Sequence, residues 1–333
     1  MKVRATSGMA KTGMALLTLT GMLATQVATS QEGDTDRNVS PAQYEQWKTD
    51  LSNWGRWGED DEIGTLNLIT PEKRIEAIAL AREGVSVSLA ADADTVAAVD
   101  NPSPYEHEML RISADSIAVN YHGIAHTHLD ALAHVNEGGT FYNGYTPDAD
   151  TVLENGHEKN SIHNLKDGII TRGILIDIPR LRGVPYLEPG TPIYIEDLEE
   201  WEEQTGVRVG SGDALFIRTG VWARREVEGP WLRGRAQGGR SAGLHPSVIP
   251  WLKERDIALL GSDHPTYVSP SNLPGALHDF ALLHLGIHMF DNCDLEALGD
   301  AAAERNRWEF LLMAAPLPIE GGTGSPLNPL AIF

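Results

Sequence analysis

Runs of residues typical of β-strands outnumber runs typical of helices, and the two kinds do not alternate regularly along the chain. The strand-like runs, rich in β-branched and aromatic residues, are 85–90, 108–115, 116–130, 168–178, 214–221, 257–263 and 308–317. A doubly wound nucleotide-binding fold needs a helix after nearly every strand. The order of the runs instead predicts an α+β domain, with peripheral helices around a central mixed sheet or barrel.

Helix starts are marked by a hydroxyl residue followed by proline. Ser40 and Thr70 each stand in this position, where the hydroxyl caps the first turn and the proline needs no hydrogen-bond donor. The expected helices are 41–54, 71–84, 196–206 and 246–256. No repeat and no obvious inter-domain linker interrupts these elements, which indicates a single domain.

The first thirty residues differ in composition from the rest of the chain. Three positive residues precede the apolar run 13–28, and small residues suited to signal peptidase follow. We therefore expect a signal peptide over 1–30, a linker over 31–40 and one domain over 41–333, which a bacterium would export to the periplasm. A retained membrane anchor is the alternative, but the apolar run is short and contains threonine and glycine.

The charge and the cysteine content limit the partners of the chain. A net charge of −21 repels nucleic acid phosphates and anionic lipid headgroups, so we expect neither nucleic acid nor, after signal cleavage, a membrane as partner. Cys293 is the only cysteine, which excludes an intrachain disulfide and a cluster of thiolate ligands. A metal ion would have to be bound by histidine and carboxylate side chains, which favours zinc or manganese.

Four of the twelve histidines lie between residues 122 and 134, around Asp130. If the run that ends at Asp130 is an extended strand, His122, His126 and His128 share one face with it. Burying one such group without a partner costs about 1–3 kcal/mol, and one divalent cation would satisfy several of them. His134, four residues beyond Asp130, is a further ligand or a general base.

A second polar patch, 274–298, lies in an apolar part of the chain. A metal site needs ligands from more than one strand, and within this patch we choose His278 and Asp291. Asp263 and His264 follow another expected strand, where active-site residues often lie. Asp263 could equally cap a turn.

The segment "AHTHLDALAH" resembles the signature of the cyclase-like metal-dependent hydrolase family, which includes bacterial kynurenine formamidase, isatin hydrolase and trans-dienelactone hydrolase. The family pattern is His-x-Gly-Thr-His-x-Asp-x-Pro-x-His, and Thr127, His128, Asp130 and His134 match it position for position. The resemblance extends over nearly the whole mature chain. It includes "NWGRWGEDDEIGTLNLITPEKR", "GDALFIRTG", "ALLGSDHP", "GIHMFDNCDLEAL" and "PLPIEGGTGSPLNPLAIF".

The chain departs from the family pattern at its first ligand. Ile124 stands where the family has histidine, and Leu132 stands in place of the proline. His126 or His122 is expected to replace the missing ligand, and we favour His126 because it is nearer in the chain. By similarity the distal ligands are His278 and Asp291, the latter in place of the commoner glutamate.

The resemblance implies a swivelling β/β/α fold, a homodimer or homotetramer, a bound zinc or manganese ion, and a small-molecule substrate. The implied reaction is hydrolysis of a small amide, cyclic amide or lactone by a metal-activated water, with His134 as the acid–base group. Trp54 and Trp57 are candidates for a flat apolar wall of the substrate site. Packing in the core is an equally good interpretation of both tryptophans.

The histidine cluster has two other interpretations. The missing ligand at Ile124 is compatible with a periplasmic metal- or ligand-binding protein of the same fold that has lost turnover. The histidines could also brace a sheet without any chemical role.

Overall fold

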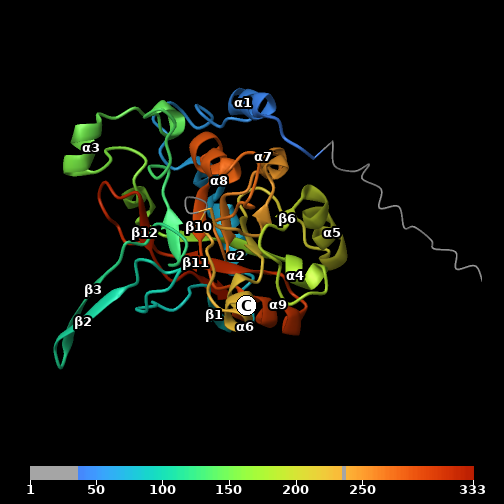
Figure 1. Ribbon diagram of the computed structural model, residues 1–333. Coiled ribbons are helices and arrows are strands. Elements are labelled where there is room, and N and C mark those ends of the chain that lie inside the picture. The colour runs from blue at the N-terminus through green and yellow to red at the C-terminus, as the bar shows by residue number, and fades with distance from the viewer. Residues whose placement is uncertain (1–36, 235–237) are drawn as a thin grey trace, which may run out of the picture. The chain divides into compact units, whose positions relative to one another are not determined.

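A nine-stranded mixed sheet forms the centre of the region Val39–Phe333. The computed structural model describes residues 37–234 and 238–333 (Figure 1), so the expected signal peptide and most of the expected linker lie outside the described residues. From edge to edge the strands are β1 (Ser86–Ser88), β13 (Leu330–Ile332), β11 (Glu309–Ala314), β5 (Ile169–Asp177), β7 (Ala214–Arg218), β9 (Leu259–Ser262), β10 (His288–Asp291), β4 (His128–Asp130) and β12 (Gly324–Pro326).

The middle of the sheet is parallel and its two sides are antiparallel. Strands β5, β7, β9 and β10 pair in parallel, whereas β11, β13 and β1 on one side and β4 and β12 on the other pair antiparallel. The parallel strands are buried on both faces, as continuous apolar runs predict. The predicted α+β class with a central mixed sheet is confirmed.

Helices surround this sheet. The α-helices are α1 (Pro41–Asp50), α2 (Pro71–Ile78), α3 (Ala149–Asn155), α4 (Ile178–Leu181), α5 (Ile195–Thr205), α6 (Val221–Glu228), α7 (Ile249–Arg255), α8 (Ala276–Phe280) and α9 (Glu296–Arg305). Shorter helical turns are Gly64–Leu68, Tyr142–Gly144, Ile162–Leu165, Pro246–Val248 and Ala281–Leu285. Among the described residues, no helix combines the length and the apolar character that crossing a membrane requires.

The expected helix starts are confirmed, although two of the helices are shorter than predicted. Ser40 Oγ accepts a hydrogen bond from Gln43 N at 3.1 Å, and Thr70 Oγ1 accepts one from Lys73 N at 3.2 Å. Both helices end before the predicted residues, at Asp50 and Ile78. A capping residue predicts the first residue of a helix closely, whereas an apolar pattern that weakens gradually does not predict its last residue.

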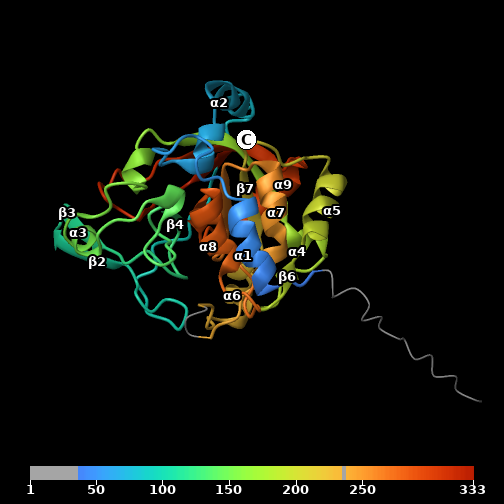
Figure 2. The same ribbon diagram turned by 90° about the horizontal axis from the view of Figure 1, so that it is seen from above.

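The predicted strands 108–115 and 116–130 are wrong in their bounds, since only parts of each range are extended. The chain forms a separate hairpin from β2 (Glu106–Arg111) and β3 (Ala114–Ala118), and residues 119–127 then run as a loop to the short strand β4. In both ribbon views the hairpin lies at one end of the domain and α5 at the other, with the sheet between them (Figures 1 and 2). The two-residue alternation that placed His122 and His126 on one strand face with Asp130 therefore does not hold. The remaining short strands, β6 (Pro192–Ile193) and β8 (Gly243–Leu244), pair with each other.

Candidate metal centre

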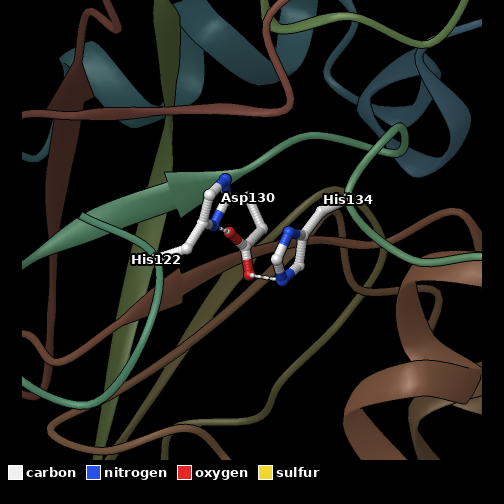
Figure 3. Close-up of side chains that lie close together, drawn as sticks. All are labelled: His122, Asp130 and His134. Carbon is white, nitrogen blue, oxygen red and sulfur yellow. Dashed lines mark ion pairs between the residues drawn. The ribbon is translucent and has the colours of Figure 1, made fainter. Parts of the chain in front are cut away.

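The carboxylate of Asp130 lies at the end of β4 and is completely buried. Its Oδ1 lies 3.0 Å from Nδ1 of His122 and 3.3 Å from Nε2 of His128. Its Oδ2 lies 3.7 Å from Nε2 of His134 and 3.3 Å from Nε2 of His278. Figure 3 shows the rings of His122 and His134 reaching the carboxylate, and these two rings are stacked with centroids 4.0 Å apart.

The sheet brings a second carboxylate to the same place. Asp291 ends β10, and the antiparallel register pairs it with His128 on β4. Cross-strand partners lie on the same face of a sheet, and His128 and Asp130 share that face because they are two residues apart. His278 of α8 completes the arrangement, since its Nε2 lies 3.3 Å from Asp130 and 3.4 Å from Oδ2 of Asp291.

The turn after β4 brings His134 back toward the carboxylate. The backbone N–H of His134 donates to the carbonyl of Ala131 at 2.9 Å, and the N–H of Ala131 donates to Thr323. A helix after Asp130 would also place His134 on the same side as Asp130. In the structure a tight turn brings the side chain of His134 back over four residues.

These side chains contain two overlapping sets of potential metal ligands. In each set, one nitrogen or carboxylate oxygen from every member lies within 4.8 Å of those from the other members, and Asp130 belongs to both. The sets are His122, Asp130 and His134, and His128, Asp130 and Asp291.

Several atoms of the cluster are close together without forming hydrogen bonds. Both oxygens of Asp130, Nδ1 of His122 and Oδ1 of Asp291 are buried and lack a hydrogen-bond partner within the described ranges. Buried polar atoms are nearly always satisfied, so a group of orphaned atoms requires an explanation. Imidazole nitrogens and carboxylate oxygens are ligands that zinc and manganese accept, and the residues present therefore fit a divalent ion.

The charges of the cluster act on its histidines in opposite directions. Burial, together with the neighbouring histidines, lowers the pKa of His134 to about 4, although Asp130 opposes this shift. Burial also disfavours the charged form of His278, but the charge of Asp291 and the close carboxylate of Asp130 hold its pKa well above the usual value. Burial raises the pKa of Asp130, but the charges of His134 and His128 outweigh it and hold that pKa well below its usual range. The cluster thus favours the neutral form of His134 and the charged form of the neighbouring His278.

His126 occupies a different position from the one the sequence argument preferred. Its Nε2 forms a hydrogen bond with the carbonyl of Ser103 at 2.8 Å, and Tyr105 packs edge-on at 4.6 Å between ring centroids. It belongs to neither ligand set, whereas His122 does. The reason is the loop: Gly123, with φ 137°, bends the chain so that His122 rather than His126 faces Asp130.

A cavity of about 390 Å³ opens beside the cluster. Its polar lining residues include His122, His126, His128, His134, His278 and Asp291, and its apolar and aromatic ones include Val99, Ile124, Leu232, Pro265, Tyr121 and Tyr267. The volume is that of a small-molecule site, and the lining combines polar groups with apolar side chains, as such sites usually do.

Neither of the tryptophans considered for a substrate wall is among the described residues that line this cavity. Trp54 donates its indole N–H to the carbonyl of Leu283 at 2.6 Å and stacks on His284. The guanidinium of Arg56 lies 4.7 Å from the ring centroid of Trp57. Both tryptophans have structural partners away from the cluster.

Asp263 is a turn cap. Its carboxylate is fully buried and accepts the N–H groups of Thr219 and Gly220 at 2.8 and 2.7 Å, together with the Thr219 hydroxyl at 2.8 Å. This is the structural alternative that the sequence left open. The lining residues Tyr121 and Tyr267 were missed, since nothing in the chain near them signals a site.

Comparison with known proteins identifies the family of the chain. Residues 43–267, which include the cluster up to His134, match the Cyclase family. The chain belongs to the Cyclase family. The resemblance to cyclase-like metal-dependent hydrolases is therefore confirmed.

One solved structure is that of a novel cyclase, whose sequence is 30% identical to this chain. The two structures superpose with a TM-score of 0.75 over 86% of this chain and 99% of the cyclase. The predicted cyclase-like fold is thus confirmed. Isatin hydrolase A from Ralstonia solanacearum shares the fold at 19% identity, with a TM-score of 0.53 over 79% of this chain and 97% of its own.

A curated relative is the isatin hydrolase of Roseibium aggregatum, which is 30% identical over 142 residues. The match covers 40% of this chain and 50% of that protein, so it spans only half of the relative.

Proposed function

We propose that this protein is a metal-dependent hydrolase that uses water to open a small amide, cyclic amide or lactone. The observation that carries the proposal is the carboxylate of Asp130, which is buried among four imidazoles with both oxygens unsatisfied in the described part of the chain. A purely structural carboxylate would be hydrogen-bonded. The name of the curated relative, isatin hydrolase, supports a cyclic amide as one substrate to test.

The residues that would hold a zinc or manganese ion are His128, Asp130 and Asp291, with His122 and His278 adjacent. His126, which the sequence argument included, is the less favoured ligand because its ring nitrogen is engaged by Ser103. When bound, a divalent ion supplies Lewis-acid polarisation of a carbonyl and lowers the pKa of a coordinated water.

His134 is our candidate for the acid–base residue. Its lowered pKa, about 4, leaves the imidazole neutral at pH 7 and able to accept a proton from the attacking water. Stacking on His122 holds the ring beside the cavity. It would return the proton to the leaving nitrogen or oxygen.

The apolar lining supports a substrate with an apolar or aromatic body. Val99, Ile124 and Leu232 come from three different segments and face the same cavity as the histidines. An uncharged ring could lie against them while its carbonyl reaches the cluster. Amides and lactones both present a carbonyl that such a site could polarise, so both belong in the test.

Purified protein, prepared without chelator, should be assayed with N-formyl aromatic amines, isatin and aromatic lactones, with and without added zinc or manganese. We expect hydrolysis of at least one class that depends on the metal. Metal binding without turnover on the whole panel would favour the alternative, a binding protein of the same fold. Turnover that persists at full rate after removal of all metal would refute the proposal.

Export and assembly are further parts of the proposal. The composition of residues 1–30 supports secretion to the periplasm, and cell fractionation with N-terminal sequencing of the mature protein tests it. We also propose a homodimer or homotetramer, which light scattering of the purified protein tests directly.

A further inference from the structure

Asn292 directly follows Asp291 at the end of β10 and is completely buried. Its φ of 55° lies in the left-handed region, which asparagine tolerates better than most residues other than glycine. The chain therefore turns sharply immediately after a carboxylate of the cluster. Asparagine suits such a turn, but its side chain is also engaged.

The side chain of Asn292 reaches across to the loop that carries the histidines. Its Nδ2 donates hydrogen bonds to the carbonyl oxygens of Gly123 at 2.8 Å and His126 at 3.1 Å. Because both partners are acceptors, only the amide NH₂ can make these bonds. The backbone carbonyl of Asn292 in turn accepts the hydroxyl of Thr127 at 2.7 Å. One residue thus fastens three points of the loop 123–127 to β10.

The carbonyl of His126 has a second partner, the ring of His128. Nδ1 of His128 lies 2.8 Å from this oxygen and must donate to it. In the neutral ring that tautomer leaves Nε2 without a proton, and Nε2 is the atom that lies 3.3 Å from Asp130. A carbonyl held in place by Asn292 therefore fixes both the tautomer and the direction of a candidate ligand.

Oδ1 of Asn292 is buried without a hydrogen-bond partner among the described residues. Leaving a buried amide oxygen unsatisfied costs free energy, so the position is not optimised for the stability of the side chain itself. The amide stabilises the structure through the two hydrogen bonds that it donates, and both are accepted by backbone carbonyls next to the cluster.

We infer that Asn292 is a positioning residue that orients His128 for the metal through the carbonyl of His126. This inference rests on the proposed function, because it assumes that His128 and Asp130 hold a divalent ion. Asn292 also links the loop that carries His122 to the strand that carries Asp291. Without the side chain of Asn292, the loop that carries His122 should no longer be held firmly beside the strand that carries Asp291.

Asn143 offers a matched control. It also has a left-handed backbone, with φ 59°, and its Nδ2 also donates to loop carbonyls, those of Gly58 at 2.9 Å and Glu59 at 3.1 Å. It is not among the described residues that line the cavity. A change there removes the same kind of contact outside the lining of the cavity.

The test compares wild type, Asn292→Gly and Asn143→Gly by zinc competition with a chromophoric chelator. Glycine retains the left-handed turn and removes only the amide. We expect Asn292→Gly to weaken zinc affinity roughly 10–100-fold, the effect typical of outer-shell partners, and Asn143→Gly to leave it within about twofold. Equal affinity in wild type and Asn292→Gly would overturn the inference, as would equal losses in both variants. Failure of the wild type to bind zinc would instead refute the proposed function, and the inference with it.

A second measurement does not depend on the variant folding. Long-range ¹H–¹⁵N spectra of the zinc-loaded wild type report which nitrogen of His128 carries the proton. The inference predicts a protonated Nδ1 and a bare Nε2 facing the metal. The opposite tautomer would overturn it, because the His126 carbonyl could then accept nothing from the ring.

Discussion

Two buried carboxylates on the same sheet have opposite surroundings. Asp213, next to β7, receives Lys73 Nζ at 2.5 Å, Arg172 Nη2 at 2.6 Å and the N–H of Gly210 at 2.8 Å. Asp130, the last residue of β4, is just as buried but lies among imidazoles. Neither of its carboxylate oxygens has a hydrogen-bond partner among the described residues. A carboxylate that serves stability is satisfied by permanent donors. One that is left unsatisfied among titratable ligands is available for an ion.

The largest expected effect separates these two carboxylates. Asp130→Asn removes a charged ligand common to both ligand sets, so we expect zinc affinity to fall beyond the roughly 100-fold loss typical of outer-shell changes, with the fold retained. Asp213→Asn should leave zinc affinity unchanged and lower the free energy of unfolding by about 3 kcal/mol, because Arg172 and Lys73 lose their shared partner. Chelator competition and urea unfolding measure the two quantities. If both variants lose stability alike and neither loses zinc, the comparison fails.

A smaller change should separate chemistry from binding within the cluster. His134→Gln is expected to lower kcat about 10²–10⁴-fold, the contribution typical of a general acid–base residue, while zinc affinity falls much less. Steady-state kinetics on the substrate found in the panel, with metal content checked, measure both effects. An undiminished kcat would exclude His134 from proton transfer.

The two candidate replacement ligands should differ in their effect on the metal. His122→Ala is expected to weaken zinc binding more than His126→Ala, since only His122 lies next to Asp130, at 3.0 Å. We expect the difference to be roughly tenfold, about 1.4 kcal/mol. Parallel zinc titrations of the two variants check it, and a larger loss in His126→Ala would restore the order that the sequence argument favoured.

The smallest expected effect is a pH dependence of metal uptake. In the metal-free protein, burial opposes the charged form of His278, but the carboxylates of Asp291 and Asp130 raise its pKa and so favour the protonated ring. The stability that this charge contributes is present below the unfolded pKa of about 6.5 and is lost as the pH rises through the raised value. A cation that enters beside it favours the deprotonated ring, so zinc uptake should release about one proton and strengthen with pH. Calorimetry in buffers of different ionisation enthalpy measures the release, and uptake without it would contradict this reading.

The sequence alone indicates which candidate site residues come together where those residues are neighbours in the chain. His128, Asp130 and His134 lie within seven residues, so a short strand and one turn bring them together whatever the rest of the fold does. His278 and Asp291 depend on the pairing of β10 with β4, which no local pattern reports. The second polar patch and the family resemblance both indicate these two residues, but neither predicts that pairing.

The loop 119–127 was the main failure of the sequence argument. Its alternation of residues resembles a strand, but Gly123 takes a positive φ and the ring of His126 is held by Ser103. Such long-range contacts override a period-two pattern. Asn292 went unnoticed for a similar reason, because an asparagine after a strand usually signals only a turn.

A crystal of the full mature chain grown with zinc or manganese tests the central claim most directly. The account predicts an anomalous difference peak in contact with a carboxylate oxygen of Asp130, with His128 and Asp291 among its other ligands. A well-ordered structure with the ion bound elsewhere, or with no ion beside Asp130 at saturating metal, would contradict it.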